Sequence, residues 1–169
     1  LLVDLVGNRN CTAINGPTWQ PEGLYLPAES YQYLVDDDGE NYLNGLSSIT
    51  VLVVVQASTV GTDHPIIYGY RTASAADRGI DIRYDVDGFS GGGTNVIKTA
   101  FGDMATDGAQ LESSSYAQTT DLQEIVSVWS ANKEMSLYLN GVKDTPTYTT
   151  NSSVSIGGLN GWYFGYGRG

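Results

Sequence analysis

Cysteine, histidine and basic residues are scarce in this chain, and each shortage excludes a class of function. The 169 residues include one cysteine and one histidine, with 8 Lys and Arg against 19 Asp and Glu. A single cysteine, Cys11, can form neither an internal disulfide nor a thiolate zinc site. The net charge of −11 opposes binding to nucleic acid and to anionic membrane surfaces, because both carry negative charge themselves.

Long apolar runs and helical periodicity are also missing. No run is long enough to cross a bilayer, and no secretory or lipidation signal is present, so we expect no membrane insertion. The 21 Gly and 12 Tyr are typical of short strands joined by turns. We therefore expect one all-β domain over residues 1–169. Because the chain has no initiator methionine, we expect a processed form, a fragment or a module of a longer protein.

A three-stranded antiparallel meander is predicted near the C-terminal end. Its strands are Leu122–Ser130, Met135–Leu139 and Val142–Tyr148. Apolar residues fall on both alternating sets of the first strand, a pattern typical of a strand covered on both faces. Asn140 and Gly141 both tolerate positive φ, so they predict a type I′ turn between the second and third strands.

Two further segments have strand patterns that differ from each other. Ser47–Ser58 (SSITVLVVVQAS) is apolar on both alternating sets, which predicts a second doubly covered core strand. Ile80–Asp85 alternates strictly, with Ile80, Ile82 and Tyr84 facing inward. We expect its other face to present Asp81, Arg83 and Asp85 outward.

The order of these motifs resembles the concanavalin A-like jelly roll, in its laminin-G-like branch. The resemblance rests on Val-x-Trp followed by a polar loop and LYLNGV, on the opening VDLVGNRNCTAINGPTW, on SSITVLVVVQAS and on VSIGG. It implies a two-sheet antiparallel jelly-roll sandwich. Members of that branch usually continue with one more strand, so we expect this sandwich to lack its closing C-terminal strand.

The resemblance does not extend to the catalytic residues of jelly-roll glycosidases. Those enzymes carry Glu-x-Asp-x-x-Glu along one strand, and this chain has no such run. The nearest acidic pair is Asp81 and Asp85, which on one strand would lie roughly 13 Å apart. Glycosidase pairs lie about 5 to 9.5 Å apart. His64 follows Asp63 without any nucleophile-elbow motif, which favours a hydrogen-bonding role in a loop. We predict no catalytic residue.

Aromatic residues near polar strand positions indicate a glycan-binding site instead. Sugars present apolar C–H faces and hydroxyls, so their sites pair an aromatic side chain with carboxylates, amides or guanidinium groups. The candidate aromatics are Tyr68, Tyr70, Trp162, Tyr163 and Tyr166, and the candidate polar partners are Asp81, Arg83 and Asp85. Trp162 is the strongest of them, since it stands in a glycine-flanked loop. The alternative is that Trp162 closes the open end of the sandwich.

The densest charge cluster predicts a Ca²⁺ site. Four of the five residues from Asp36 to Glu40 are acidic. Asp36, Asp38 and Glu40 alternate, and alternate carboxylates in a tight turn can converge on one hard cation. The alternative is a solvated surface loop whose charges repel one another.

Two functions fit these observations. The first is an extracellular or cell-surface binding module that recognises a glycan or a protein surface ligand. The second is a structural protein of a virion surface, such as a capsid decoration, head-fibre or tail-fibre domain that contacts neighbouring coat or fibre subunits. The jelly-roll fold serves both roles, so fold alone does not choose between them.

Overall fold

The computed structural model describes residues 2–3, 10–26, 32–36, 43, 45–70, 78–88, 93–102, 108–131, 133–150, 156 and 161–165. Every regular element in this part of the chain is a β-strand. The strands are β1 (Leu2–Val3), β2 (Asn10–Ile14), β3 (Thr18–Gln20), β4 (Gly23–Tyr25), β5 (Tyr33–Asp36), β6 (Ser48–Val55), β7 (His64–Tyr70), β8 (Arg78–Asp85), β9 (Val96–Phe101), β10 (Ala109–Glu112), β11 (Gln123–Ser130), β12 (Ser136–Leu139), β13 (Val142–Lys143), β14 (Tyr148–Thr150) and β15 (Gly161–Phe164). Over the residues described, no helix has the length and apolarity that a membrane span requires.

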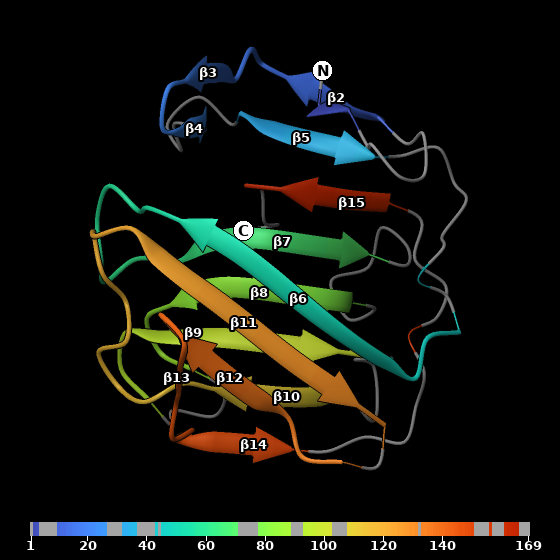
Figure 1. Cartoon of the computed structure of the whole chain (residues 1–169), viewed down its shortest axis with the longest axis vertical. Coiled ribbons are helices and arrows are strands. Elements are labelled where there is room, and N and C mark those ends of the chain that lie inside the picture. Colours follow the sequence, from blue (N-terminus) through green and yellow to red (C-terminus); the bar gives the residue numbers. More distant parts are fainter. Residues whose placement is uncertain are drawn as a thin grey trace.

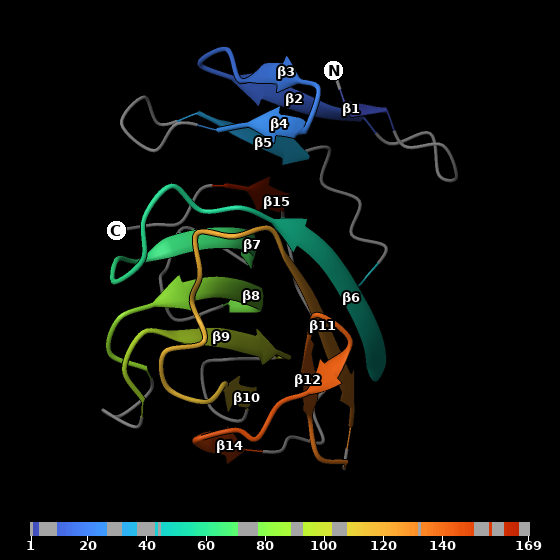
Figure 2. The ribbon, with the colours of Figure 1, turned by 60° about the vertical axis from the view of Figure 1, so that its left-hand side comes forward.

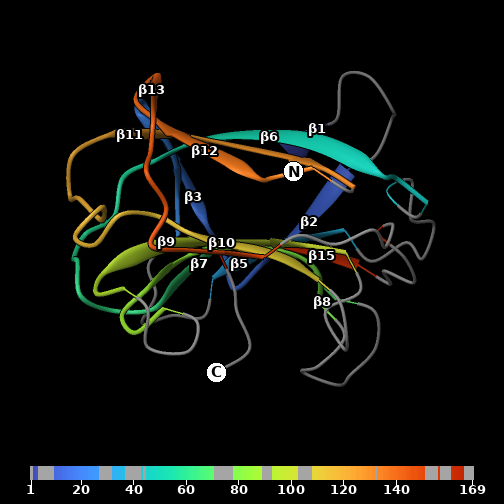
Figure 3. The same cartoon turned by 90° about the horizontal axis from the view of Figure 1, so that it is seen from below.

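Two antiparallel sheets face each other and confirm the predicted all-β sandwich. The larger sheet has nine strands in the order β1-β2-β5-β15-β7-β8-β9-β10-β14, and the smaller has four in the order β13-β12-β11-β6. Figure 1 looks onto the smaller sheet, whose strands cross those of the larger sheet obliquely. Figure 3 shows the two layers edge-on, an arrangement consistent with a jelly-roll-like fold. A separate hairpin joins β3 to β4.

The hydrophobic core fills the space between the two sheets. β11 and β12 contribute Ile125, Trp129 and Leu137, all almost fully buried. β8 and β9 contribute Ile80, Ile82, Tyr84, Ile97 and Phe101 from the opposite side. A hydrogen bond also crosses the gap, since the hydroxyl of Tyr84 donates to Oε1 of Gln123 at 2.6 Å. Burial of this apolar area is the main stabilising contribution to such a sandwich.

The predicted meander is confirmed for its first two strands and wrong for part of its third. β11 pairs with β12, and Asn140 and Gly141 have φ values of 50° and 78°, as a type I′ turn requires. The return strand is only β13. After Lys143 the chain leaves the small sheet, and Tyr148 begins β14 at the edge of the large sheet, paired with β10. Pro146 lies between the two strands, where it removes no ladder hydrogen bond.

The prediction that two strands are covered on both faces is wrong. β6 is an edge strand, and its outward residues Leu52 and Val54 are 59% and 56% exposed. In β11 the residues Val126 and Val128 are only half-buried. The described part of the chain places no third layer over this sheet, so the second apolar set of each strand faces outward.

The last described strand lies inside the large sheet. β15 pairs with β5 on one side and with β7 on the other, so it joins the N-terminal strands to the rest of the sheet (Figure 2). The interpretation of Trp162 as a loop residue is therefore wrong, because Trp162 is the second residue of β15. The VSIGG motif lies mostly outside the described residues; its Ile156 is buried and donates its N–H to the carbonyl of Leu46 at 2.9 Å.

Candidate functional site

One face of the nine-stranded sheet, turned away from the core, carries charged and aromatic residues; we call it the polar face. In β8 the apolar residues enter the core, so the residues that alternate with them lie on the opposite side. The register extends this face across the neighbouring strands, because Asp81 is opposite Tyr68 and Arg83 is opposite Lys98. In β7 to β10 the charged and aromatic residues of the polar face include Tyr68, Asp81, Arg83, Asp85, Lys98 and Glu112.

Asp81 and Arg83 form a buried bidentate ion pair. Nε of Arg83 donates to Oδ1 of Asp81 at 2.8 Å, and a terminal guanidinium nitrogen donates to the other carboxylate oxygen. Burial alone would lower the pKa of Arg83, but attraction to Asp81, with smaller contributions from Asp85 and Asp63, raises it. Both side chains were expected to face solvent. They share the predicted face, yet Asp81 is only 2% exposed and Arg83 only 8%.

Asp85 and Lys98 form a second pair that holds the backbone just after β8. Nζ of Lys98 donates to Oδ2 of Asp85 at 3.0 Å and approaches the carbonyl oxygen of Gly88 at 3.4 Å. Oδ1 of Asp85 accepts from the N–H groups of Gly88 at 2.8 Å and Asp87 at 3.2 Å. Asp85 thus uses both oxygens within the chain, and its predicted outward orientation is replaced by a buried one.

Glu112 is a polar-face residue that the sequence prediction missed. It lies in β10 and is fully buried. Neither of its carboxylate oxygens has a hydrogen bond of normal geometry in the described structure. Burial raises the pKa of Glu112, and Asp85 adds to the rise. Attraction to Lys98 opposes it, as do weaker interactions with the Thr147 side chain and the Gly93 backbone. Gly88 packs directly on it, since a Cβ there would lie 2.7 Å from Oε2 of Glu112. The available signal was the alternation of AQLE, which puts Leu111 and Glu112 on opposite faces of a strand; the structure then places Glu112 opposite Lys98.

Replacing Glu112 with Gln is expected to remove a pH dependence of stability. Folding raises the pKa of Glu112. The stabilising contribution of Glu112 is therefore complete at pH values below the pKa that this residue has in the unfolded chain. That contribution is lost as pH rises through the folded pKa. Thermal melting from pH 4 to pH 8 should therefore show wild type and variant equal at the acid end. Glu112→Gln should be the more stable at the alkaline end, because burial disfavours the charged form of Glu112 and the amide stays neutral. Melting temperatures that change with pH in the same way for both proteins would contradict the expectation.

Three tyrosines form a row on the polar face beside Asp81. Tyr33, Tyr163 and Tyr68 come from the adjacent strands β5, β15 and β7. The ring centroids of Tyr33 and Tyr163 are 5.6 Å apart at an interplanar angle of 61°, and those of Tyr68 and Tyr163 are 6.3 Å apart at 33°. Tyr68 is buried, whereas Tyr33 and Tyr163 are half-buried. This tyrosine row therefore leads from partly accessible rings to the buried pair of Asp81 and Arg83.

The other predicted aromatics are placed only through their backbones. Trp162 is opposite Gly69 on one side and Asp36 on the other, and Tyr70 is opposite Gly161. The side chains of Trp162 and Tyr70 lie outside the part of the chain that the structure describes, as does the whole of Tyr166. Tyr163 is thus the predicted aromatic that the structure brings to the polar face together with Tyr68, and Tyr33 joins them without having been predicted.

The predicted Ca²⁺ ligands are only partly described. Asp36 is the last residue of β5, while Asp38 and Glu40 lie outside the described residues. Within the described ranges, no group of three or more His, Cys, Asp or Glu side chains could hold a metal ion, so the Ca²⁺ site stays a prediction. His64 opens β7 instead of lying in a loop. Its Nε2 lies within hydrogen-bond distance of the hydroxyls of Thr59 and Thr62, at 3.1 and 2.5 Å.

Comparison with known proteins defines the fold class and goes no further. No family model and no curated protein sequence matches this chain. Among solved structures, the chain is similar to the one described as the crystal structure of botulinum neurotoxin serotype D binding domain, with a TM-score of 0.63 at 15% identity. The match covers 99% of this chain and 41% of that chain, so this chain spans about two fifths of its length. The likeness shows a shared all-β sandwich fold.

Proposed function

We propose that this chain is a non-catalytic binding module that holds a glycan against the tyrosine row of its polar face. The observation that carries the proposal is the alignment of Tyr33, Tyr163 and Tyr68 on three adjacent strands. Phenol rings offer apolar faces to sugar C–H groups and hydroxyls to sugar oxygens, and a rigid sheet fixes their spacing. The concanavalin A-like, lectin-type identity inferred from the sequence motifs agrees with this use of a sheet face.

The charged residues have a supporting role in this proposal. Asp81 and Arg83 satisfy each other, and Asp85 is held by Lys98. All four are buried, so they support the strands behind the tyrosine row and do not bind sugar directly. Asp85 and Glu112 both contact Gly88, but neither is open to solvent. Asp81, Asp85 and Glu112 are therefore not exposed to a substrate as an acid pair, which supports a binding function.

A Tyr163→Ala variant tests the proposal on a glycan array. We expect it to lose at least about tenfold in retention, or about 1.4 kcal/mol, because the middle ring of the row is removed. Tyr163→Phe, which keeps the ring, should retain most binding to sugars that stack. The matched control is Tyr25→Ala, which removes a tyrosine that is 53% exposed on the β3–β4 hairpin. Unchanged retention by Tyr163→Ala, or no glycan bound by the wild-type chain, would refute the proposal.

A structural role on a virion surface is the second candidate. The observation that favours it is the exposed apolar outer face of the four-stranded sheet, including Leu52 and Val54 of β6. Exposed apolar surface is one mark of contact with another protein. An extracellular or virion setting fits both candidates, and the neighbouring subunits would contact a surface separate from the tyrosine row.

A further inference from the structure

The second ion pair of the polar face brings a nucleophile to a carboxyl group. Nζ of Lys98 lies 3.0 Å from Oδ2 of Asp85, and the two residues are only 9% and 7% exposed. A lysine that loses a proton becomes a nucleophilic amine, whereas an arginine keeps its charge in proteins. The pair of Asp81 and Arg83 can therefore only stay ionic, but Lys98 and Asp85 can react with each other.

The carboxyl group of Asp85 is held as acyl transfer requires. Its Oδ1 accepts from the N–H groups of Gly88 at 2.8 Å and Asp87 at 3.2 Å. Two backbone donors on one oxygen stabilise the negative charge that develops there when a nucleophile adds to the carboxyl carbon. The other oxygen, Oδ2, accepts from Nζ of Lys98. Because the carboxyl carbon is bonded to Oδ2, the amine needs only a small shift to reach the attack distance of about 3–3.5 Å.

Glu112 supplies an acid beside these two groups. It lies directly opposite Lys98 in the register of β9 and β10, and its carboxyl group packs on Gly88, whose N–H donates to Asp85. Glu112 is fully buried, and neither of its carboxylate oxygens has a hydrogen bond of normal geometry in the described structure. Burial raises the pKa of Glu112, so this side chain retains its proton to a higher pH than an exposed Glu and can donate it.

We propose that Lys98 and Asp85 condense into an amide bond after the chain has folded, with Glu112 as the proton carrier. The nitrogen of Lys98 loses two protons and forms a bond to Cγ of Asp85. The bond between Cγ and Oδ2 breaks, and Oδ2 leaves with both protons as water. One proton passes along the hydrogen bond from Nζ to Oδ2. Glu112 donates the other and is reprotonated from the nitrogen, so it ends unchanged, and the step needs neither an oxidant nor a cofactor.

The fold favours this product over the ion pair. Two buried charges carry a desolvation cost that a neutral amide avoids. The strands hold the amine and the carboxyl group in contact, and well-oriented intramolecular reactions reach effective molarities of about 10⁵–10⁸ M. Asp85 ends β8 and Lys98 lies in β9, so the bond fastens two neighbouring strands to each other.

Mass spectrometry of the full chain tests the proposal. Under denaturing conditions the wild-type chain should be lighter than the mass calculated from its sequence by one water molecule. Trypsin cleaves after Arg83, Lys98 and Lys133, so an unreacted chain gives the peptides 84–98 and 99–133. An amide on Lys98 blocks cleavage there. A single peptide 84–133, lighter by one water molecule, should therefore replace those two.

Two variants separate the bond from the ion pair and from the fold. Lys98→Arg keeps a cation beside Asp85 but cannot form the amide, so it should have its full calculated mass. Glu112→Gln keeps the shape of the side chain and loses the acid, which should slow bond formation by about 10²–10⁴-fold. Cooperative melting of both variants checks that they fold. Lys98→Arg is also the background in which the pH-dependent stability of Glu112→Gln is measured, because neither protein of that comparison then carries the bond.

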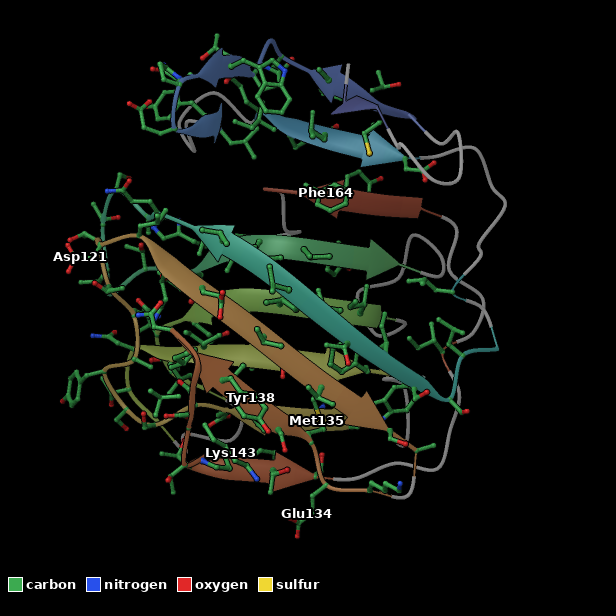
Figure 4. The ribbon with its side chains drawn as sticks, in the orientation of Figure 1. Asp121, Glu134, Met135, Tyr138, Lys143 and Phe164 are labelled. Carbon is green, nitrogen blue, oxygen red and sulfur yellow. The ribbon has the colours of Figure 1, made fainter. Side chains whose placement is uncertain are left out.

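Lys143→Arg is the matched control. Lys143 is exposed on β13 of the four-stranded sheet (Figure 4), so this variant should still lack one water molecule. A folded wild-type chain with its full calculated mass would overturn the proposal. Loss of water with normal cleavage after Lys98 would overturn it too, because that result indicates a succinimide at Asp87-Gly88. Bond formation by Glu112→Gln at the wild-type rate would show that Glu112 does not carry the proton.

Discussion

Replacing Arg83 with Met is expected to destabilise the domain by about 3–5 kcal/mol. The guanidinium of Arg83 holds both oxygens of Asp81, and Asp81 is 2% exposed. Removing the cation leaves a buried carboxylate without its counter-charge, which costs far more than the pair itself contributes. Urea unfolding monitored by tryptophan fluorescence measures the loss directly, because the midpoint should fall without a change in slope.

Two further variants separate this desolvation effect from a loss of packing. Asp81→Asn combined with Arg83→Met leaves no unpaired charge, so we expect the double variant to recover much of the stability. Lys143→Met removes a positive charge from an exposed position on β13 and should change stability by less than about 0.5 kcal/mol. If the double variant is as unstable as Arg83→Met alone, the ion pair is not the cause.

Replacing Trp129 with Ala is expected to cost about 3–5 kcal/mol as well, through a different mechanism. Trp129 is 1% exposed and stacks on Phe101 across the core, with ring centroids 5.9 Å apart and an interplanar angle of 15°. Truncation removes its buried area and leaves a cavity between the two sheets. The free energy of unfolding of Trp129→Ala, measured by urea titration, should fall. Trp19→Ala is the control: Trp19 is 59% exposed, so the urea midpoint of this variant should change little.

Trp129→Phe makes the same prediction more specific. The indole nitrogen of Trp129 is buried without a hydrogen-bond partner in the described structure. Phe lacks that N–H group and keeps an aromatic ring on Phe101, so part of the lost packing is offset by the removal of an unsatisfied donor. We expect Trp129→Phe to cost clearly less than Trp129→Ala. Equal losses for the two variants would show that the stacked ring contributes little.

Local sequence patterns predicted the class of fold well because strand periodicity is a local property. The period of two in β8 and β12 and the Asn140-Gly141 turn need only neighbouring residues for their interpretation, and the structure confirms each. Whether another layer covers a strand, by contrast, depends on distant parts of the chain. An apolar residue such as Leu52 has the same pattern whether another layer covers it or not, so β6 was predicted to be buried on both faces although it lies at an edge.

The candidate site was predictable to the same degree. Alternation placed Asp81, Arg83 and Asp85 on one face, and the structure agrees. It did not reveal that these side chains pair with each other and with Lys98 and become buried. The tyrosine row depends on β15 lying between β5 and β7, which come from distant parts of the sequence. No short pattern could place Tyr33 next to Tyr163, because that contact depends on the order of strands in the sheet.

The position of β15 also determines the order in which the large sheet can form. Among the residues that the structure describes, β1, β2 and β5 connect to β7 and its neighbours through β15. During synthesis β1, β2 and β5 can pair with one another, but their hydrogen-bonded connection to β7 waits until residues 161–164 have left the ribosome. Such long-range pairing slows folding and exposes strand edges in the meantime. The large sheet of a newly made chain should therefore be completed late, when its C-terminal part is available. In a chain truncated before β15, the N-terminal strands should be the first to separate from the rest of the sheet.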